Sequence, residues 1–120
     1  MARVIVVGDG PGGLSAALFL AKGGQQVEVI GRGATGLNHA FLHNYLGLPE
    51  LDGRELHARA AAQVARLGAL LHDATAAAVT AGEDGITVEL DSGEVLAGDY
   101  LVLAEGKTPV LARTLDLPED

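Results

Sequence analysis

Cysteine is missing from all 120 residues, so the sequence offers no disulfide, no thiolate metal ligand and no dithiol redox centre. Tryptophan is missing as well, and two Phe and two Tyr are the only aromatic residues. A stacking platform for nucleic acid needs several aromatic rings, and this composition does not supply them. Because disulfides are rare inside the cell, the absence of cysteine fits an intracellular protein, and we expect a cytoplasmic one.

Positive charge is also scarce: eight Lys and Arg residues stand against sixteen Asp and Glu, a formal net charge of -8. This balance repels phosphate backbones and anionic lipid, so we expect neither nucleic acid nor membrane as a partner. No apolar run approaches the roughly 20 residues of a membrane-spanning helix, and no signal-peptide pattern precedes the first glycines. The length and the 48% hydrophobic content predict one soluble domain over residues 1–120.

Hydrophobic periodicity predicts alternating strands and helices in the first part of the chain. Short β-branched or apolar runs indicate buried strands, and apolar residues at helical spacing indicate amphipathic helices. Asp52, followed three residues later by Glu55, resembles a capping box at the start of the second helix. The expected elements are a strand at 3–7, a helix at 13–22, a strand at 27–30, a long connection at 31–51, a helix at 52–67 and a strand at 69–71.

The period then changes to that of an antiparallel meander. Segments 75–80, 86–90 and 94–97 are separated by two turn signals, Glu83-Asp84-Gly85 and Asp91-Ser92-Gly93. Residues 100–104 form a continuous apolar run, which predicts a buried strand that returns to the parallel sheet. We expect residues 107–120 to form a surface tail.

Three glycines follow the first strand at a spacing with chemical meaning. Gly8, Gly10 and Gly13 match G-x-G-x-x-G between a predicted strand and a predicted helix. The first permits a sharp turn, the second lets a ligand reach backbone N–H groups, and the third allows close packing of helix on strand. The helix N-terminus would then hold a pyrophosphate. The alternative is that these glycines only form a tight connection in a domain without a nucleotide.

The end of the second strand lacks the acid that commonly binds the ribose of a dinucleotide. Gly31 and Arg32 stand there instead, and Glu28 lies inside the strand, facing away from Val27 and Val29. Arg32 by itself favours the 2′-phosphate of NADP. It could equally be a solvated loop residue.

Several segments resemble the flavin domain of thioredoxin-reductase-like pyridine nucleotide-disulfide oxidoreductases. "VIVVGDGPGGLSAALFLA" resembles the N-terminal FAD fingerprint of the family, and "HNYLGLPELDGRELHARAAAQVARLGA" is similar to its Asn-aromatic-x-Gly segment and the helix that follows. "DYLVLAEG" resembles the strand that ends in Ala-Thr-Gly, and "LDLP" is similar to the stretch leading out of the first flavin segment. Together these segments extend over nearly the whole chain, in the family's order.

This resemblance implies an α/β, Rossmann-like FAD/NAD(P)-binding fold in three layers, with a parallel sheet in the order 3-2-1-4 and an antiparallel meander insert. It implies FAD as the cofactor, with NAD(P)H as a possible substrate or alternative ligand, and explains Gly31, since the family commonly has a small residue there. Residues 31–38 would border the adenosine. Asn44 would lie near the isoalloxazine, or equally would organise its loop as an amide. The implied cofactor-binding residues are Gly8, Gly10, Pro11, Gly12, Gly13, Gly31, Arg32, Asn44 and Gly106.

The sequence also departs from the family. Glu105 replaces the small hydroxyl residue of Ala-Thr-Gly, and these 120 residues contain no dithiol, no NADPH domain and no closing flavin segment. The primary hypothesis is an FAD-binding flavoprotein, an oxidoreductase without an identified catalytic residue. The alternatives are an NADP-binding module that uses Arg32, and a non-catalytic module whose site a homodimer or a partner chain completes. His39 and His43 are four residues apart, but their spacing does not predict a metal site.

Overall fold

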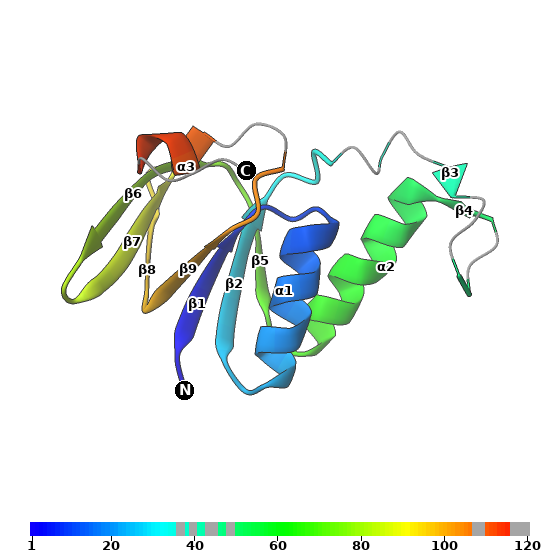
Figure 1. The fold of residues 1–120 in the computed structure, drawn as a ribbon, viewed down its shortest axis with the longest axis horizontal. Coiled ribbons are helices and arrows are strands. Elements are labelled where there is room, and N and C mark those ends of the chain that lie inside the picture. The colour runs from blue at the N-terminus through cyan, green and yellow to red at the C-terminus, as the bar shows by residue number, and fades with distance from the viewer. Residues whose placement is uncertain (36–37, 39–40, 43–45, 48–49, 107–109, 116–120) are drawn as a thin grey trace.

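The computed structural model describes residues 1–35, 38, 41–42, 46–47, 50–106 and 110–115. The elements run in the order β1 (Arg3–Val7), α1 (Pro11–Lys22), β2 (Gln26–Gly31), β3 (Phe41–Leu42), β4 (Leu51–Asp52), α2 (Gly53–Arg66), β5 (Leu70–Asp73), β6 (Ala76–Gly82), β7 (Gly85–Leu90), β8 (Val95–Gly98), β9 (Tyr100–Leu103) and α3 (Val110–Thr114). Figure 1 shows α1 and α2 side by side against one sheet, with the meander strands on the other side of the molecule.

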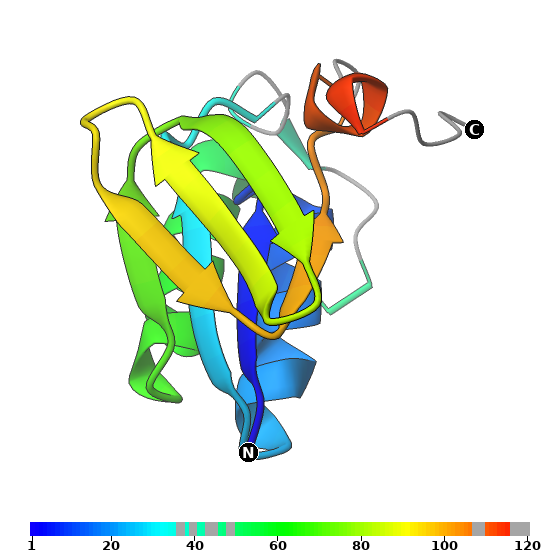
Figure 2. The same ribbon diagram turned by 90° about the vertical axis from the view of Figure 1, so that its left-hand side faces the viewer.

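The main sheet has four strands in the order β5-β2-β1-β9, all parallel to their neighbours. This confirms the predicted order 3-2-1-4. Strands β6, β7 and β8 form a separate antiparallel sheet, as the two turn signals predicted. In Figure 2 this sheet faces the viewer, with the parallel sheet behind it and helices α1 and α2 farthest away. The molecule therefore has the three predicted layers.

The central strands β1 and β2 of the parallel sheet are buried on both faces because each layer covers one of them. Alternate residues of β1 belong to two hydrophobic cores, one on each face of the sheet. Val4 and Val6 pack with α1 and α2, whereas Ile5 and Val7 pack with the meander. Ile5 and Val6 are fully buried. Among the described residues no polar or charged residue is buried, so apolar burial on both faces of the sheet is the main source of stability.

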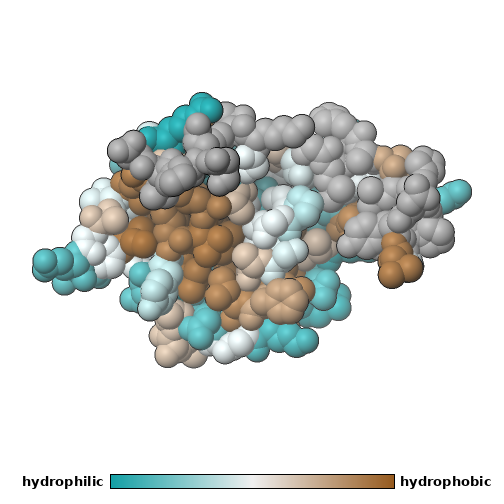
Figure 3. Space-filling model, in the orientation of Figure 1, coloured by the Kyte–Doolittle hydropathy of each residue, from teal (hydrophilic) through white to brown (hydrophobic). Residues whose placement is uncertain are grey.

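Strand β9 differs from its expected environment. The apolar run predicted full burial, but β9 lies at the edge of the sheet with β1 as its one neighbour, and Tyr100 is 63% exposed. Figure 3 shows an apolar area over this part of the molecule, to the left of the helices. An apolar edge strand is a surface on which further polypeptide can pair or pack.

Three local expectations are corrected by the structure. Helix α1 begins at Pro11 rather than Gly13, because proline suits the first position of a helix. The connection at 31–51 contains the antiparallel pair β3–β4. Part of the expected tail is helix α3, where Leu111 and Ala112 are buried. In the part of the chain that the structure describes, none of the helices is long and apolar enough to cross a membrane.

Candidate functional site

The glycine loop joins the carboxyl end of β1 to α1, and close backbone contacts fix two of its glycines. Gly8 has φ +114°, and a Cβ there would overlap the carbonyl of Ala104 at the end of β9. A Cβ on Gly13 would overlap the carbonyl of Gly8 and touch Val6. Gly8 therefore permits the turn and Gly13 the close approach of helix to strand, the roles that the spacing predicted.

The middle of the loop leaves the start of α1 open. Gly10 is the N-cap and has no side chain to cap the helix, and the first turn of α1 contains no acidic residue. A Cβ on Gly12 would meet no atom within 4 Å. Helix α2 is the opposite case, because the Asp52 carboxylate accepts a hydrogen bond from the backbone N–H of Arg54 at 2.9 Å. No hydrogen bond between described residues thus caps the start of α1 from a side chain, and the space beside Gly12 is open, as an anion requires.

The capping box expected at α2 is only half formed. Asp52 caps the helix, but the side chain of Glu55 pairs with Arg59 one turn later, at 2.6 Å. Glu55 thus forms an i,i+4 ion pair in place of the second capping contact, and such pairs are common on an exposed helix face.

The segment after β2 folds back onto the glycine loop. A Cβ on Gly10 would lie 3.2 Å from Thr35 Oγ1, so Thr35 stands beside the second glycine. Asn38 holds this segment in shape by donating from its side chain to the carbonyl of Gly33, at 2.6 Å. Of the residues expected to border an adenosine, Gly33 and Thr35 therefore lie next to the glycine loop.

Asp9 lies between the first two glycines and was not recognised from the sequence. Its Oδ2 accepts a hydrogen bond from the backbone N–H of Gly33 at 2.9 Å. Its carboxylate lies where a side chain of residue 31 would be, since a Cβ on Gly31 would overlap Asp9 Cγ and approach both of its oxygens. A larger residue at position 31 would therefore have to displace the Asp9 carboxylate, and the backbone angles of Gly31 do not themselves favour glycine.

His57 is another residue that was not recognised from the sequence. It lies on α2, and its Nε2 is 2.7 Å from the backbone carbonyl oxygen of Asp9. With Nε2 protonated, the imidazole donates to that carbonyl and fixes the glycine loop against α2. A histidine on an amphipathic helix gives no sequence signal for such a contact 48 residues away.

Arg32 points toward the meander. Its Nε donates to Thr75 Oγ1 at 3.0 Å, and its guanidinium pairs with Asp91 and, at 3.7 Å, with Asp73. The hydrogen bond to Arg32 holds the pKa of Asp91 below its ordinary value, and the Asp91 carboxylate raises the pKa of Arg32. The guanidinium is therefore already neutralised by two carboxylates.

Glu28 lies on the meander side of β2, on the face opposite Val27 and Val29 as the alternation predicted. There its Oε1 is 3.0 Å from Nε2 of His72, and both side chains are largely covered. This pairing removes Glu28 from the strand end where a ribose would be bound.

Glu105 and Gly106 follow β9 beside the glycine loop. Both carboxylate oxygens of Glu105 accept backbone N–H groups of α3, from Leu111 at 2.8 Å and from Ala112 at 3.1 Å. The carboxylate is thus directed to the start of α3. Gly106 has φ +79°, a conformation that favours glycine, and a Cβ there would meet no atom within 4 Å.

Asn44, His39 and His43 lie outside the described residues. Among the residues that are described, no group of three His, Cys, Asp or Glu side chains could hold a metal ion.

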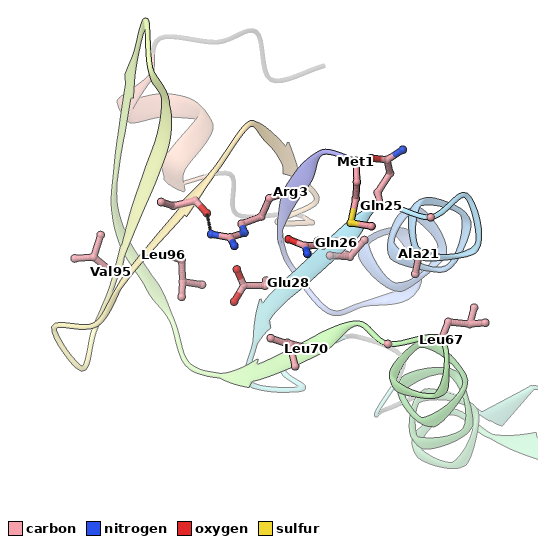
Figure 4. Close-up of a pocket in the computed structure, with 14 residues that line it drawn as sticks. Met1, Arg3, Ala21, Gln25, Gln26, Glu28, Leu67, Leu70, Val95 and Leu96 are labelled. Atoms are coloured by element: carbon pink, nitrogen blue, oxygen red, sulfur yellow. Dashed lines mark hydrogen bonds between the residues drawn. The ribbon is translucent and has the colours of Figure 1, made fainter.

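A cavity of about 680 Å³ lies elsewhere, between the meander and the amino-terminal ends of β1 and β2. Figure 4 shows Arg3, Gln26, Glu28, Leu70 and Leu96 around it. Ligands of open α/β sheets bind at the carboxyl ends of the strands. The glycine loop, at that other end, is therefore the better candidate site.

Known proteins show the same arrangement. The family described as pyridine nucleotide-disulphide oxidoreductase matches residues 2–120. One of the subunits of alkyl hydroperoxide reductase in Escherichia coli (strain K12) is 28% identical over 109 residues, which are 86% of this chain and 21% of that protein. The chain thus spans about a fifth of this curated relative.

Two solved structures give the same result. The atypical thioredoxin reductase TRi from Desulfovibrio vulgaris Hildenborough superposes with a TM-score of 0.80 at 32% identity, over 90% of this chain and 37% of that one. A thioredoxin reductase from Gloeobacter violaceus gives 0.78 at 26% identity, over 85% and 36%. The fold is therefore the Rossmann-like FAD-binding fold of thioredoxin reductases, as the resemblance implied. The chain belongs to the pyridine nucleotide-disulphide oxidoreductase family.

Proposed function

We propose that this chain forms part of an FAD-binding flavoprotein, with the FAD pyrophosphate at the start of α1. The observation that carries the proposal is the open helix start: Gly10 offers no side-chain cap, the first turn has no acid, and Gly12 faces open space. An acidic protein can bind a pyrophosphate in this way because backbone N–H groups and the helix dipole supply the positive charge.

The residues around this start fit an adenine dinucleotide. Thr35 and Gly33 border Gly10 and Asp9, so the segment after β2 offers a place for the adenosine next to the pyrophosphate. Bound FAD would supply hydride or electron transfer, and the protein would bind and orient it. Oxidoreductase activity follows from the family, and NAD(P)H is the natural class of electron donor for it.

The test is FAD binding to the purified protein, measured by flavin absorbance after desalting and by quenching of flavin fluorescence on titration. Gly12→Asp is the informative variant, since its side chain enters open space, the acid favours a helix start, and the carboxylate repels a pyrophosphate. Gln63→Glu, on the exposed surface of α2, adds the same charge elsewhere. We expect wild type and Gln63→Glu to bind FAD and Gly12→Asp to lose at least about tenfold in affinity. Absence of binding by the wild type refutes the proposal.

An NADP-binding module that uses Arg32 is the second candidate. The pairing of Arg32 with Asp91 and Asp73 works against it, because a 2′-phosphate would have to displace two carboxylates. Titration with NADPH and NADH, before and after Arg32→Ala, decides the matter. A preference for NADPH that Arg32→Ala removes would favour this candidate.

A non-catalytic module completed by another polypeptide is the third candidate. Edge strand β9 favours it, since Tyr100 is 63% exposed and Figure 3 shows an apolar area over this part of the molecule. Size-exclusion chromatography with light scattering tests a homodimer, and a strict monomer that still binds FAD would count against it.

A further inference from the structure

We propose that Asp9 recognises the ribose of the adenosine, so that the glycine loop supplies the acid that the end of β2 lacks. This inference rests on the proposed dinucleotide site and names its specificity-determining residue. Three observations carry it: the place of the Asp9 carboxylate, its hydrogen bonding, and the engagement of the other charged residues nearby.

The carboxylate reaches the right place by a different route. An acid at the end of a second strand binds the ribose hydroxyls in dinucleotide sites of this architecture. Here that strand ends at Gly31, and the Asp9 carboxylate lies where the Cβ of a larger residue 31 would be, at the base of the missing side chain. In this chain the acid is thus on the glycine loop, as Asp9, and the glycine is at the end of the second strand, as Gly31.

The hydrogen bonds of Asp9 fix its orientation and leave it able to accept another. The N–H of Gly33 binds Oδ2, and His57 holds the backbone carbonyl. Among the bonds between described residues, none goes to Oδ1, although Asp9 is half-buried. A half-buried carboxylate oxygen without a partner is a strong acceptor for a sugar hydroxyl.

The other charged side chains near the strand end have partners. Glu28 is paired with His72 on the meander face of the sheet. Arg32 is paired with Asp91 and lies 3.7 Å from Asp73, the residue opposite Gly31 on β5. Asp9 is therefore the acid best placed to meet a ligand on the glycine loop. The same carboxylate would repel a 2′-phosphate, so the site selects an adenosine with a free 2′-hydroxyl.

The experiment removes first the ligand's 2′-hydroxyl and then the Asp9 carboxylate from the proposed hydrogen bond. ADP carries both the pyrophosphate and the adenosine ribose, and 2′-deoxy-ADP lacks only the hydroxyl in question. Calorimetric titration of wild type, Asp9→Gly and the exchange variant Asp9→Gly/Gly31→Asp with both ligands gives six dissociation constants. We expect the wild type to prefer ADP by about tenfold, Asp9→Gly to show no preference, and the exchange variant to regain most of it.

Each outcome has one meaning. A purely structural role of Asp9 would weaken ADP and 2′-deoxy-ADP equally, leave the preference unchanged in Asp9→Gly, and overturn the inference. Equal affinity of the wild type for the two ligands, with FAD still bound, would also overturn it while the proposed function stands. Absence of binding of both FAD and ADP to the wild type would refute the proposed function and this inference with it.

Discussion

The carboxylate of Asp9 fills the space that a side chain at residue 31 would need, and Gly31 is the residue that admits it. The two residues lie on different elements and are 22 positions apart in the sequence. Their contact joins the glycine loop to the end of β2, and the hydrogen bond from Gly33 to Asp9 reinforces it.

This relationship predicts a non-additive effect on stability. Gly31→Ala should destabilise the wild type by about 1–3 kcal/mol, because the new Cβ overlaps the Asp9 carboxylate. The same substitution in an Asp9→Gly background should cost much less, because the overlapping atoms are gone. Urea denaturation of the four proteins measures the coupling free energy. Additive effects would show that the loop simply moves away.

A second prediction separates the glycines by their surroundings. Gly13→Ala should destabilise the protein by about 2 kcal/mol or more, because its Cβ overlaps the backbone of Gly8. Gly12→Ala is the matched control one residue away, where the Cβ meets open space, and it should leave stability unchanged or raise it by up to about 1 kcal/mol. Thermal unfolding without a cofactor is the measurement. Equal effects at the two positions would contradict the packing argument.

Much of the fold could be predicted from the sequence, because its signals are local. A β-branched run before Gly8 predicts β1, helical spacing predicts α1 and α2, and two glycine-containing turns predict the meander. The strand order came from the family resemblance, since no local pattern states which strands are neighbours. The pair β3–β4 was missed because two-residue strands have no detectable alternation.

The site could be predicted only where a motif of neighbouring residues indicates its chemistry. G-x-G-x-x-G predicts a pyrophosphate-binding loop, but Asp9 occupies a variable position of that motif, so the motif gives it no role. Its partners Gly31, Gly33 and His57 become neighbours only through the tertiary fold. Arg32 could be interpreted either way, because its partner Asp91 is 59 residues away.

A third prediction concerns Glu105, which departs from the family pattern. Its carboxylate accepts the N–H groups of Leu111 and Ala112, so Glu105→Ala should lose about 1 kcal/mol of stability, as for a helix cap. Amide hydrogen exchange should show faster exchange at these two positions in particular. Glu83→Ala, in the exposed turn after β6, is the control and should change neither. Unchanged protection of α3 in Glu105→Ala would contradict the capping role.

The last prediction follows from the pair of Arg32 and Asp91, which joins the end of β2 to the turn after β7. The hydrogen bond from Arg32 keeps the pKa of Asp91 below its ordinary value of 3.8. A carboxylate whose pKa is lower in the folded state contributes stability above its unfolded pKa, and this contribution is lost as the pH falls through the folded pKa. Arg32→Gln should therefore be less stable than wild type at pH 7, by a small amount because the pair is exposed.

The difference between Arg32→Gln and wild type should shrink as the pH falls from the ordinary pKa of 3.8 through the lowered pKa of Asp91, because Asp91 of the unfolded chain becomes protonated before Asp91 of the folded wild type. Urea denaturation at pH 7 and at successive pH values below 4 measures it. Arg54→Gln removes a positive charge from an exposed residue of α2 and serves as the control. If both variants show the same pH dependence, the loss of stability comes from the change in net charge and not from the Arg32–Asp91 pair. If the stability difference from wild type also shrinks in high salt for Arg32→Gln alone, the pair is its source, since salt screens exposed ion pairs.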